Sequence, residues 1–391
     1  MPVRTLSLTD FRTYRQLDLE FAEGSHVMVG RNAAGKTNLV EALVVLSSGR
    51  SHRSSADGEL VRWGSPFTRV SATISVAGRA EDLEVVIFAP GASAGSRKRV
   101  RVNGINRRAS ALAPHLRSVL FAPEDMDLIV GSPSGRRGLL DDLVIQREVA
   151  ASETLSTYAR ALTQRNALLR RIREETAGSA ELPYWDDLLC EAGGRILDWR
   201  HEALAALADP LAAAQREIAP QEPDLLLRYD SNVVPHPGES ATAALKRRLG
   251  ETAQKEIWNG ATLVGPHRDD IVFEAGGRDL TRFASRGQQR TAILALKLAE
   301  VDLLTTLDGH PPLLLLDDVF SELDPERRAH LGRRIGTLPQ TIVTTTTADD
   351  LDPALVAASS LWEVEPGMAR PVSASARRDG SRTPPMPGSS A

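Results

Sequence analysis

Residues 30–37 read Gly30-Arg31-Asn32-Ala33-Ala34-Gly35-Lys36-Thr37, which fits the pattern GxxxxGK[ST] of a loop that cradles phosphate groups. An apolar run, His26-Val27-Met28-Val29, leads into the loop, and Leu39, Val40 and Leu43 follow it at helical spacing. The pattern requires this order of strand, loop and helix, because the helix then presents its positive N-terminal end to the phosphates. The stretch therefore predicts an α/β fold with a nucleotide site. In that site Lys36 would contact the β- and γ-phosphates of ATP, and the Thr37 hydroxyl would ligate Mg²⁺.

A second motif lies far along the chain, where Leu313-Leu314-Leu315-Leu316 precedes Asp317 and Asp318. An apolar run without alternation is typical of a parallel strand that is covered on both faces. A carboxylate at the end of such a strand can complete the Mg²⁺ shell, which is the role expected for Asp317. Asp318 is the candidate catalytic residue that orients or deprotonates the attacking water. The alternative is that the two acids only cap the following loop.

The side chain of Asp318 is one methylene shorter than that of a glutamate. Because hydrolysis depends on near-attack geometry, we expect slow turnover, which suits a switch better than a motor.

A third motif, Ser285-Arg286-Gly287-Gln288, is expected to open a helix, with Ser285 as its N-cap. The Ser285 hydroxyl, the backbone amides and the helix dipole would form a second anion site. A chain with one phosphate loop and one separate anion clamp favours a head-to-tail pair of chains, in which each clamp completes the partner's site. The alternative is an ordinary serine-capped helix.

Longer blocks around these motifs resemble the RecF family of bacterial recombination mediators. The blocks are residues 30–53, 121–141, 262–270, 284–300 and 313–324. The resemblance implies an SMC-like ABC-type ATPase head that dimerises on ATP and binds DNA. It further implies action with RecO and RecR to load RecA at single-strand gaps, and support of the SOS response.

The same resemblance assigns roles to individual residues. Lys36, Thr37, Asp317, Asp318 and Ser285 take the family roles described above. Arg12 resembles a position that reaches the nucleotide in related heads. A dimer loop is expected at Ser321, Glu322, Leu323 and Asp324. Two departures from transporter cassettes are visible, since residues 342–347 contain no switch histidine and no Gln-loop is obvious near Pro123-Glu124-Asp125.

Periodicity divides the chain into segments. Residues 1–130 and 259–365 are expected to form the two halves of one ATPase lobe, with 131–258 inserted between them as a helical lobe. Long helices are expected at 152–175 and 184–218, and a strand region at 261–275. The composition of residues 366–391, rich in Pro, Ser, Arg and Gly, predicts a disordered tail.

Composition narrows the class of protein. The 391 residues carry a net charge of −4, so any nucleic-acid surface must be local. One cysteine excludes an internal disulfide and a CxxC metal site. No apolar run approaches the ~20 residues that span a bilayer. We therefore expect a cytoplasmic protein with no membrane partner.

One segment has six basic residues and no acid, and it is the first candidate for DNA contact. Its alternative role is a charged edge strand that prevents aggregation. A second candidate is the row Arg160, Arg165, Arg170, Arg171 and Arg173, for which a solvated helix face is the favoured interpretation. Without an aromatic stripe beside either patch, duplex DNA or a single/double-strand junction is the expected ligand. The residues of the first candidate are Arg97, Lys98, Arg99, Arg101, Arg107 and Arg108.

The pairs Arg136-Arg137 and His267-Arg268 remain open between structural and binding roles. Three rival functions share a phosphate loop with the favoured one. A transporter cassette should carry a switch histidine, and a chromosome-structure protein should carry sustained heptads on long arms; this chain shows neither. A nucleotide-dependent scaffold without significant hydrolysis differs from the favoured function only in rate.

Overall fold

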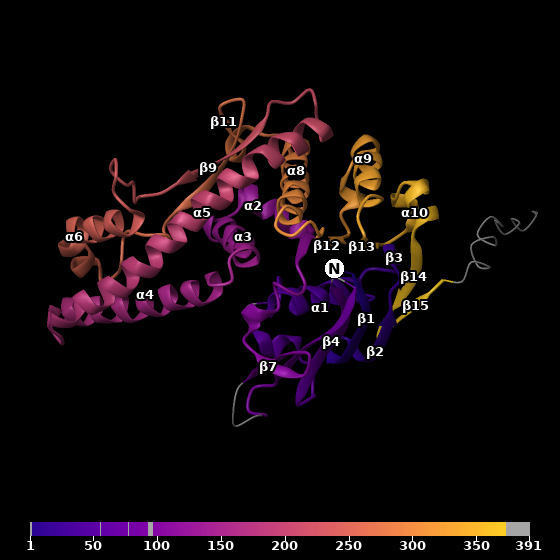
Figure 1. Cartoon of the computed structure of the whole chain (residues 1–391), viewed down its shortest axis with the longest axis horizontal. Helices are drawn as coiled ribbons and strands as arrows, with labels where there is room; N and C mark the ends of the chain where they lie inside the picture. Colours follow the sequence, from indigo (N-terminus) through magenta and orange to yellow (C-terminus); the bar gives the residue numbers. More distant parts are fainter. Residues whose placement is uncertain (1, 55, 77, 93–96, 373–391) are drawn as a thin grey trace, which may run out of the picture. The chain divides into compact units, whose positions relative to one another are not determined.

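The computed structural model describes residues 2–372 except 55, 77 and 93–96, and the chain divides into two compact units. The first, here called the sheet unit, contains residues 2–46, 50–107 and those from 313 onward. The second, the helical unit, contains residues 47–49 and 108–312 (Figure 1). The two chain ends thus build one α/β unit, and the helical unit is inserted between them in sequence, which confirms the predicted fold class.

The sheet unit holds two sheets. One is antiparallel, in the order β2-β1-β4-β5-β6-β7, and the other runs β15-β14-β3-β13-β12 within this unit. In the second sheet β14, β3, β13 and β12 are parallel, and only β15 is antiparallel to its neighbour. The strands are β1 (Val3–Phe11), β2 (Tyr14–Glu20), β3 (Gly24–Val29), β4 (Phe67–Val76), β5 (Arg79–Phe88), β6 (Lys98–Val102), β7 (Ile105–Arg107), β12 (Leu313–Asp317), β13 (Gln340–Thr345), β14 (Ser360–Glu365) and β15 (Met368–Pro371), and the helices are α1 (Lys36–Ser48, its last residues in the helical unit), α9 (Pro325–Ile335) and α10 (Pro353–Ala358).

Burial explains why these segments are strands. In β2 the apolar Leu17 and Leu19 are buried while the residue between them is exposed, as expected for a half-buried antiparallel strand. All of β12 is buried and it pairs in parallel with β13, which confirms the prediction of a buried parallel strand from its leucine run. The parallel register places Asp317 beside Thr344 and Thr344 beside Met28. The carboxyl end of β12 therefore aligns with the end of β3 that leads into the loop at 30–37.

In the helical unit α5 packs along α4, α6 and α8 (Figure 1). Its core contains Leu189, Cys190, Ile196, Leu245 and Leu249, all nearly inaccessible to solvent. None of the helices that the structure describes is long and apolar enough to cross a bilayer. The elements of this unit are β8 (Ser118–Phe121), α2 (Asp127–Val130), α3 (Pro133–Arg147), α4 (Ala151–Arg173), α5 (Leu182–Ile218), β9 (Leu225–Asp230), α6 (Ala241–Asn259), β10 (Asp270–Ala275), β11 (Arg278–Asp279), α7 (Leu280–Phe283) and α8 (Arg286–Thr305).

The two long helices predicted at 152–175 and 184–218 correspond to α4 and α5. Other expectations differ from the structure. The helical unit extends well beyond 131–258, because α8 packs on α5 and belongs to the same unit. The segment 131–258, predicted as a helical lobe, also contains a strand, β9, which pairs with β10.

The predicted strand at 261–275 begins only at Asp270, since residues 262–269 form a loop held by side-chain hydrogen bonds. In the predicted disordered tail, β15 pairs with β14 and buries Ala369. Disorder over those strand residues was therefore a wrong expectation, and residues 373–391 lie outside the described residues.

Arginines that the sequence offered as DNA contacts are partly structural. Arg165 is 2% exposed and forms ion pairs with Asp186 (2.5 Å) and Glu256 (2.7 Å). Arg136 is likewise buried and holds Asp270 through two hydrogen bonds of 2.6 and 2.8 Å. Neither guanidinium can reach a phosphate without breaking these pairs. Both residues are therefore removed from the set of DNA candidates.

His267 is also structural, since its Nδ1 lies 2.7 Å from the Tyr158 hydroxyl. Burial lowers the pKa of His267 to about 4, so the ring is neutral at pH 7. Within the same unit, Arg200 donates to Asp141 and to the carbonyl of Pro266, which anchors the loop at 262–269. These contacts explain why that loop is ordered without being a strand.

Replacing Arg165 with Ala should lower the free energy of unfolding by about 3–5 kcal/mol, because the buried carboxylate of Glu256 and the partly exposed one of Asp186 then lose their cation. Arg171→Ala, an exposed position on the same helix, serves as the control and should change stability by less than about 0.5 kcal/mol. Urea unfolding measures both. Equal stability of the two variants would contradict a structural role for Arg165.

Candidate nucleotide-binding site

Residues 30–35 form a loop that connects β3 to α1, and residues 36 and 37 of the motif open α1, in the order of strand, loop and helix that the sequence predicted. Gly35 has φ 110° and Ala33 has φ 66°, both in the left-handed region that glycine tolerates best. A methyl group on Gly35 would lie 2.7 Å from the Tyr14 hydroxyl, and one on Gly30 would collide with the Val364 carbonyl. Both glycines are therefore required by the packing of the protein itself, before any ligand is considered.

Lys36 is the central cation of the loop and is only 6% exposed. Its ammonium donates to the carbonyl oxygens of Gly30 (2.6 Å) and Arg31 (3.2 Å). Burial lowers the pKa of Lys36, an effect opposed by the nearby charges of Asp318 and Asp317. In the described part of the chain no carboxylate lies within ion-pair distance of this ammonium. A buried cation held only by neutral carbonyls fits an anionic ligand.

The two aspartates are held at the end of β12 by Thr344 of β13. The Thr344 hydroxyl donates to Asp317 Oδ1 (2.5 Å) and accepts from the backbone N–H of Asp318 (3.1 Å). Asp318 has φ 54°, so its side chain leaves the strand in a different direction from that of Asp317. Thr344 was not predicted as a site residue, although it begins the run of threonines at 344–347 that stands where a transporter would carry its histidine.

Arg12 lies in the turn between β1 and β2 and also has a positive φ, 51°. Its guanidinium forms two hydrogen bonds, 2.8 and 2.7 Å long, with the carboxylate of Glu41 on α1. Burial alone would raise the pKa of Glu41, but hydrogen bonds from Arg12 and Ser51 leave it lowered. The turn further contacts the loop through the Tyr14 hydroxyl, which donates to Gly35 O (3.1 Å). The sequence analysis did not predict Glu41 as a site residue. An acidic residue on the buried face of an amphipathic helix was the pattern that could have identified it.

The motif at 285–288 belongs to the helical unit and opens α8. The Ser285 hydroxyl accepts from the Gln288 N–H (3.3 Å), and the Gln288 side chain accepts from the Ser285 N–H (3.0 Å). This reciprocal pair is a capping box. Ser285, Arg286, Gly287 and Gln288 are all exposed, and a methyl group on Gly287 would meet nothing closer than 3.8 Å. The end of the helix is therefore accessible to a ligand.

The expected dimer loop follows Asp318 directly. The Ser321 hydroxyl donates to the Asp318 carbonyl (2.9 Å), and Leu323 is buried. Asp324 caps α9 by accepting from the Arg327 N–H (3.0 Å). Glu322 ends the short 3₁₀ turn between them. The loop is thus tied to the candidate catalytic residue through its backbone.

Acidic side chains from other segments neutralise part of the positive charge of the basic segment at 97–108. Arg99 and Arg101 lie on the outer face of β6, but Arg101 pairs with Glu84 (3.2 Å). Lys98 pairs with Asp57 (2.7 Å), and Arg108, in the helical unit, with Glu153 (2.9 Å). Arg97, Arg99 and Arg107 are exposed, and the Arg99 guanidinium lies 5.7 Å from the centre of the Phe88 ring.

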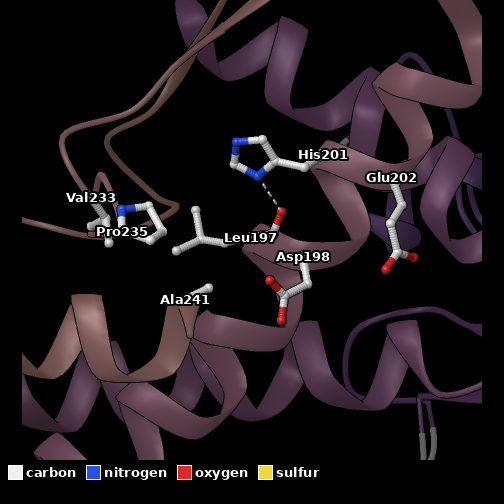
Figure 2. Close-up of a pocket in the computed structure, with 7 residues that line it drawn as sticks. All are labelled: Leu197, Asp198, His201, Glu202, Val233, Pro235 and Ala241. Carbon is white, nitrogen blue, oxygen red and sulfur yellow. Dashed lines mark hydrogen bonds between the residues drawn. The ribbon is translucent and has the colours of Figure 1, made fainter. Parts of the chain in front are cut away.

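A cavity of about 290 Å³ in the helical unit contains none of the residues predicted for the nucleotide site. Figure 2 shows Asp198, His201 and Glu202 on one helix, α5, with a hydrogen bond from the His201 ring to the Leu197 carbonyl (2.8 Å). Among the described residues, no group of three or more His, Cys, Asp or Glu side chains is placed to hold a metal ion.

Comparisons with known proteins identify the family of the chain. A family model described as RecF/RecN/SMC N terminal domain matches residues 2–366. The DNA replication and repair protein RecF of Lacticaseibacillus casei (strain BL23) is 37% identical over 374 residues, covering 94% of this chain and 99% of that protein. The chain belongs to the RecF family. A RecF of the same description from Chloroflexus aurantiacus (strain ATCC 29364 / DSM 637 / Y-400-fl) is 40% identical over 387 residues, covering 94% of this chain and 99% of that protein.

Solved structures extend the comparison from sequence to fold. The structure of the recombination mediator protein RecF-ATP in the RecFOR pathway has a TM-score of 0.85 and 31% identity, covering 95% of this chain and 97% of that one. An Smc head bound to the C-winged helix domain of ScpA, with a TM-score of 0.53 and 16% identity over 95% of this chain and 97% of that one, shares the fold alone. The RecF-family chain therefore has an SMC-like ABC-type ATP-binding fold with the capacity for ATPase activity.

The residues present fit ATP with Mg²⁺. The buried ammonium of Lys36 suits the phosphates, and the Thr37 hydroxyl and Asp317 carboxylate are hard oxygen donors of the kind that Mg²⁺ prefers. Two protein ligands are sufficient, because Mg²⁺ at such sites is completed by phosphate oxygens and water.

Gly30→Ala should destabilise the protein by about 1–3 kcal/mol without any nucleotide present, since its methyl group collides with the Val364 backbone. Gly287→Ala is the matched control and should cause no loss, because that position is open and alanine favours a helix. Thermal unfolding without ATP distinguishes them. An unchanged melting temperature for Gly30→Ala would contradict the packing role of this glycine.

Proposed function

We propose that this protein is an ATP-dependent DNA-binding switch of recombinational repair and replication restart. The observation that carries the proposal is the presence, in one RecF-family chain, of a complete phosphate loop and a separate exposed capping box. Lys36 offers a buried positive charge to phosphates in the sheet unit, and Ser285 offers a second anion site in the helical unit. One chain thus supplies a phosphate loop to one composite nucleotide site and a capping box to another.

Two chains arranged head to tail would complete both sites. Each nucleotide would lie between residues 30–37 of one chain and residues 285–288 of its partner, with the loop at 321–324 at the dimer interface. The negative phosphates of ATP would hold the two half-sites together, because the phosphate loop of one chain and the capping box of its partner both attract anions. The homodimer is therefore expected only with ATP and Mg²⁺.

Hydrolysis is proposed to be slow and stimulated by DNA. Asp318 is the residue that would position or deprotonate the attacking water. Its backbone N–H donates to the Thr344 hydroxyl, which helps to hold the residue in place. Arg12 would act on the nucleotide only after leaving Glu41, so its present role is to hold the turn beside the loop. Slow hydrolysis would reset the dimer. A scaffold that does not hydrolyse ATP is the second candidate, and only the rate separates the two.

Partners follow from family membership. RecF-family proteins are proposed to act with RecO and RecR to load RecA at single-strand gaps in the cytoplasm, and to support the SOS response. Duplex DNA or a junction is the proposed ligand of this chain. Among the described residues, the exposed arginines Arg97, Arg99 and Arg107 have beside them the Phe88 ring near Arg99, but no row of aromatic side chains on which bases could stack.

The first test is sedimentation of the wild type, Lys36→Met and Ser285→Arg with and without ATP and Mg²⁺. Wild type should convert from monomer to dimer with ATP, and both variants should stay monomeric. Only Lys36→Met should also lose ATP binding, measured with a fluorescent analogue, because Ser285 acts on the partner's nucleotide. A chain that remains monomeric under all conditions would exclude the shared site and leave a nucleotide-binding scaffold.

Turnover of the DNA-bound wild type should lie far below tens per second. A steady-state rate in that range would overturn the switch, and no hydrolysis above the Lys36→Met background would favour the scaffold.

A double change, Arg99→Ala with Arg107→Ala, should weaken duplex binding and reduce the slope of log K against log salt by about 2, one unit for each phosphate that is no longer neutralised. The control is Arg228→Ala, which changes an exposed arginine of β9. Arg165→Met is unsuitable as a control because the ion pairs of Arg165 are buried. An unchanged salt slope would place the DNA surface elsewhere.

A further inference from the structure

A second cavity, of about 320 Å³, lies in the helical unit and is independent of the proposed ATP switch. It is formed where the end of α5 meets β9, the β10–β11 hairpin, α7 and the first turns of α8. Its apolar wall includes Leu225 and Leu280, both almost fully buried. Its polar lining consists of Gln215, Glu222, Arg278, Asp279 and Gln288.

Gln215 gives the cavity a buried acceptor. This side chain is 3% exposed, and its Nε2 donates a long hydrogen bond of 3.5 Å to Glu222. That contact orients the amide, so that the nitrogen faces the carboxylate and Oε1 is the free end. Oε1 is buried and has no hydrogen-bond partner among the described residues. An unsatisfied buried acceptor is costly, so it points to a donor that arrives with a ligand.

The charges at the cavity favour a cation. Two carboxylates, Glu222 and Asp279, line it against one guanidinium, that of the exposed Arg278. Asp279 also accepts from the Thr281 N–H (2.8 Å) and lies 3.9 Å from the guanidinium of Arg282, which does not line the cavity. A phosphate backbone would be repelled by this pair of carboxylates, which argues against nucleic acid as the occupant.

The walls of the cavity favour a side chain from a protein. Leu225 and Leu280 can cover an aliphatic stem, and Phe283, which also lines the cavity, is 68% exposed. An exposed phenylalanine beside a small polar-ended cavity is typical of the centre of a protein interface.

We propose that this cavity receives an arginine side chain from a segment of a protein partner. The methylene stem would lie between Leu225 and Leu280, and the guanidinium would donate to Gln215 Oε1 and to the carboxylates of Glu222 and Asp279. Gln288 lines the same cavity and also closes the capping box of α8 with Ser285. A bound partner would therefore touch the helix end that presents the second anion site.

The probe is N-acetyl-arginine methylamide, and its matched control is the citrulline analogue, which keeps the shape but lacks the charge and carries a carbonyl oxygen in place of one terminal NH₂ group. Binding to the full chain is measured by ligand-observed NMR without ATP or DNA, so the outcome is independent of the ATP-dependent dimer. Crystals soaked with the probe locate it. The variants are Gln215→Leu and Glu222→Gln. Glu202→Gln, in the cavity of Figure 2, is the control substitution of a glutamate elsewhere in the helical unit.

The arginine probe should bind the wild type in the millimolar range, and the citrulline analogue about tenfold more weakly, as expected when a charge-assisted hydrogen bond is replaced by a neutral one. Glu222→Gln and Gln215→Leu should each weaken the arginine probe about fivefold or more, and Glu202→Gln should leave it unchanged. Since Glu222 is near the surface, its variant keeps the test decisive even if Gln215→Leu fails to fold. Equal binding of the two probes, insensitivity to Glu222→Gln, or a crystal with only water on Gln215 would overturn the proposal. Dimerisation without nucleotide through this cavity would assign it to a second copy of the chain and also overturn it.

Discussion

Parallel pairing of β13 with β3 on one side and β12 on the other is the constraint on which the nucleotide site depends. The phosphate loop and the two aspartates lie about 280 residues apart in the chain, and neither motif contains information about the other. The register of β13 aligns Met28, Thr344 and Asp317 in one row across the sheet. Because the strands are parallel, all three carboxyl ends meet at the same edge, which is where open α/β sheets bind their ligands.

The site is supported from the opposite side by the turn between β1 and β2. Tyr14 touches Gly35, and Arg12 holds Glu41 on the helix that begins with Lys36. Arg12, Ala33 and Asp318 all have left-handed backbone conformations, which are strained for residues other than glycine. The Asp318 N–H donates to the Thr344 hydroxyl and the Asp318 carbonyl accepts from the Ser321 hydroxyl, and these bonds hold Asp318 in that conformation. The candidate catalytic carboxylate is therefore positioned by its backbone before any nucleotide is present.

The helical unit uses charge differently. Arg136, Arg165 and Arg200 are buried and paired with carboxylates, so their guanidinium groups anchor helices and the loop at 262–269 instead of forming a positive surface. Such pairs contribute little net stability but are costly to break, because each would leave an uncompensated buried charge. A buried polar group without a partner is costly in the same way. Gln215 Oε1 is such an acceptor, and the cavity that it lines is therefore the proposed ligand site.

Local sequence was sufficient to specify the phosphate loop, the buried leucine strand with its aspartates, the N-cap at Ser285 and the two long helices. Each of these is encoded by neighbouring residues through spacing, propensity or capping. Thr344, Glu41 and Gln215 became visible only in the folded chain, because their roles come from partners brought close by strand register or helix packing. The basic segment at 97–108 illustrates the same limit, since no acid lies within it in sequence and yet Asp57 and Glu84 reach its side chains in space. Local patterns thus specify which polar and charged groups a segment carries. The fold decides which partners satisfy their hydrogen bonds or neutralise their charges.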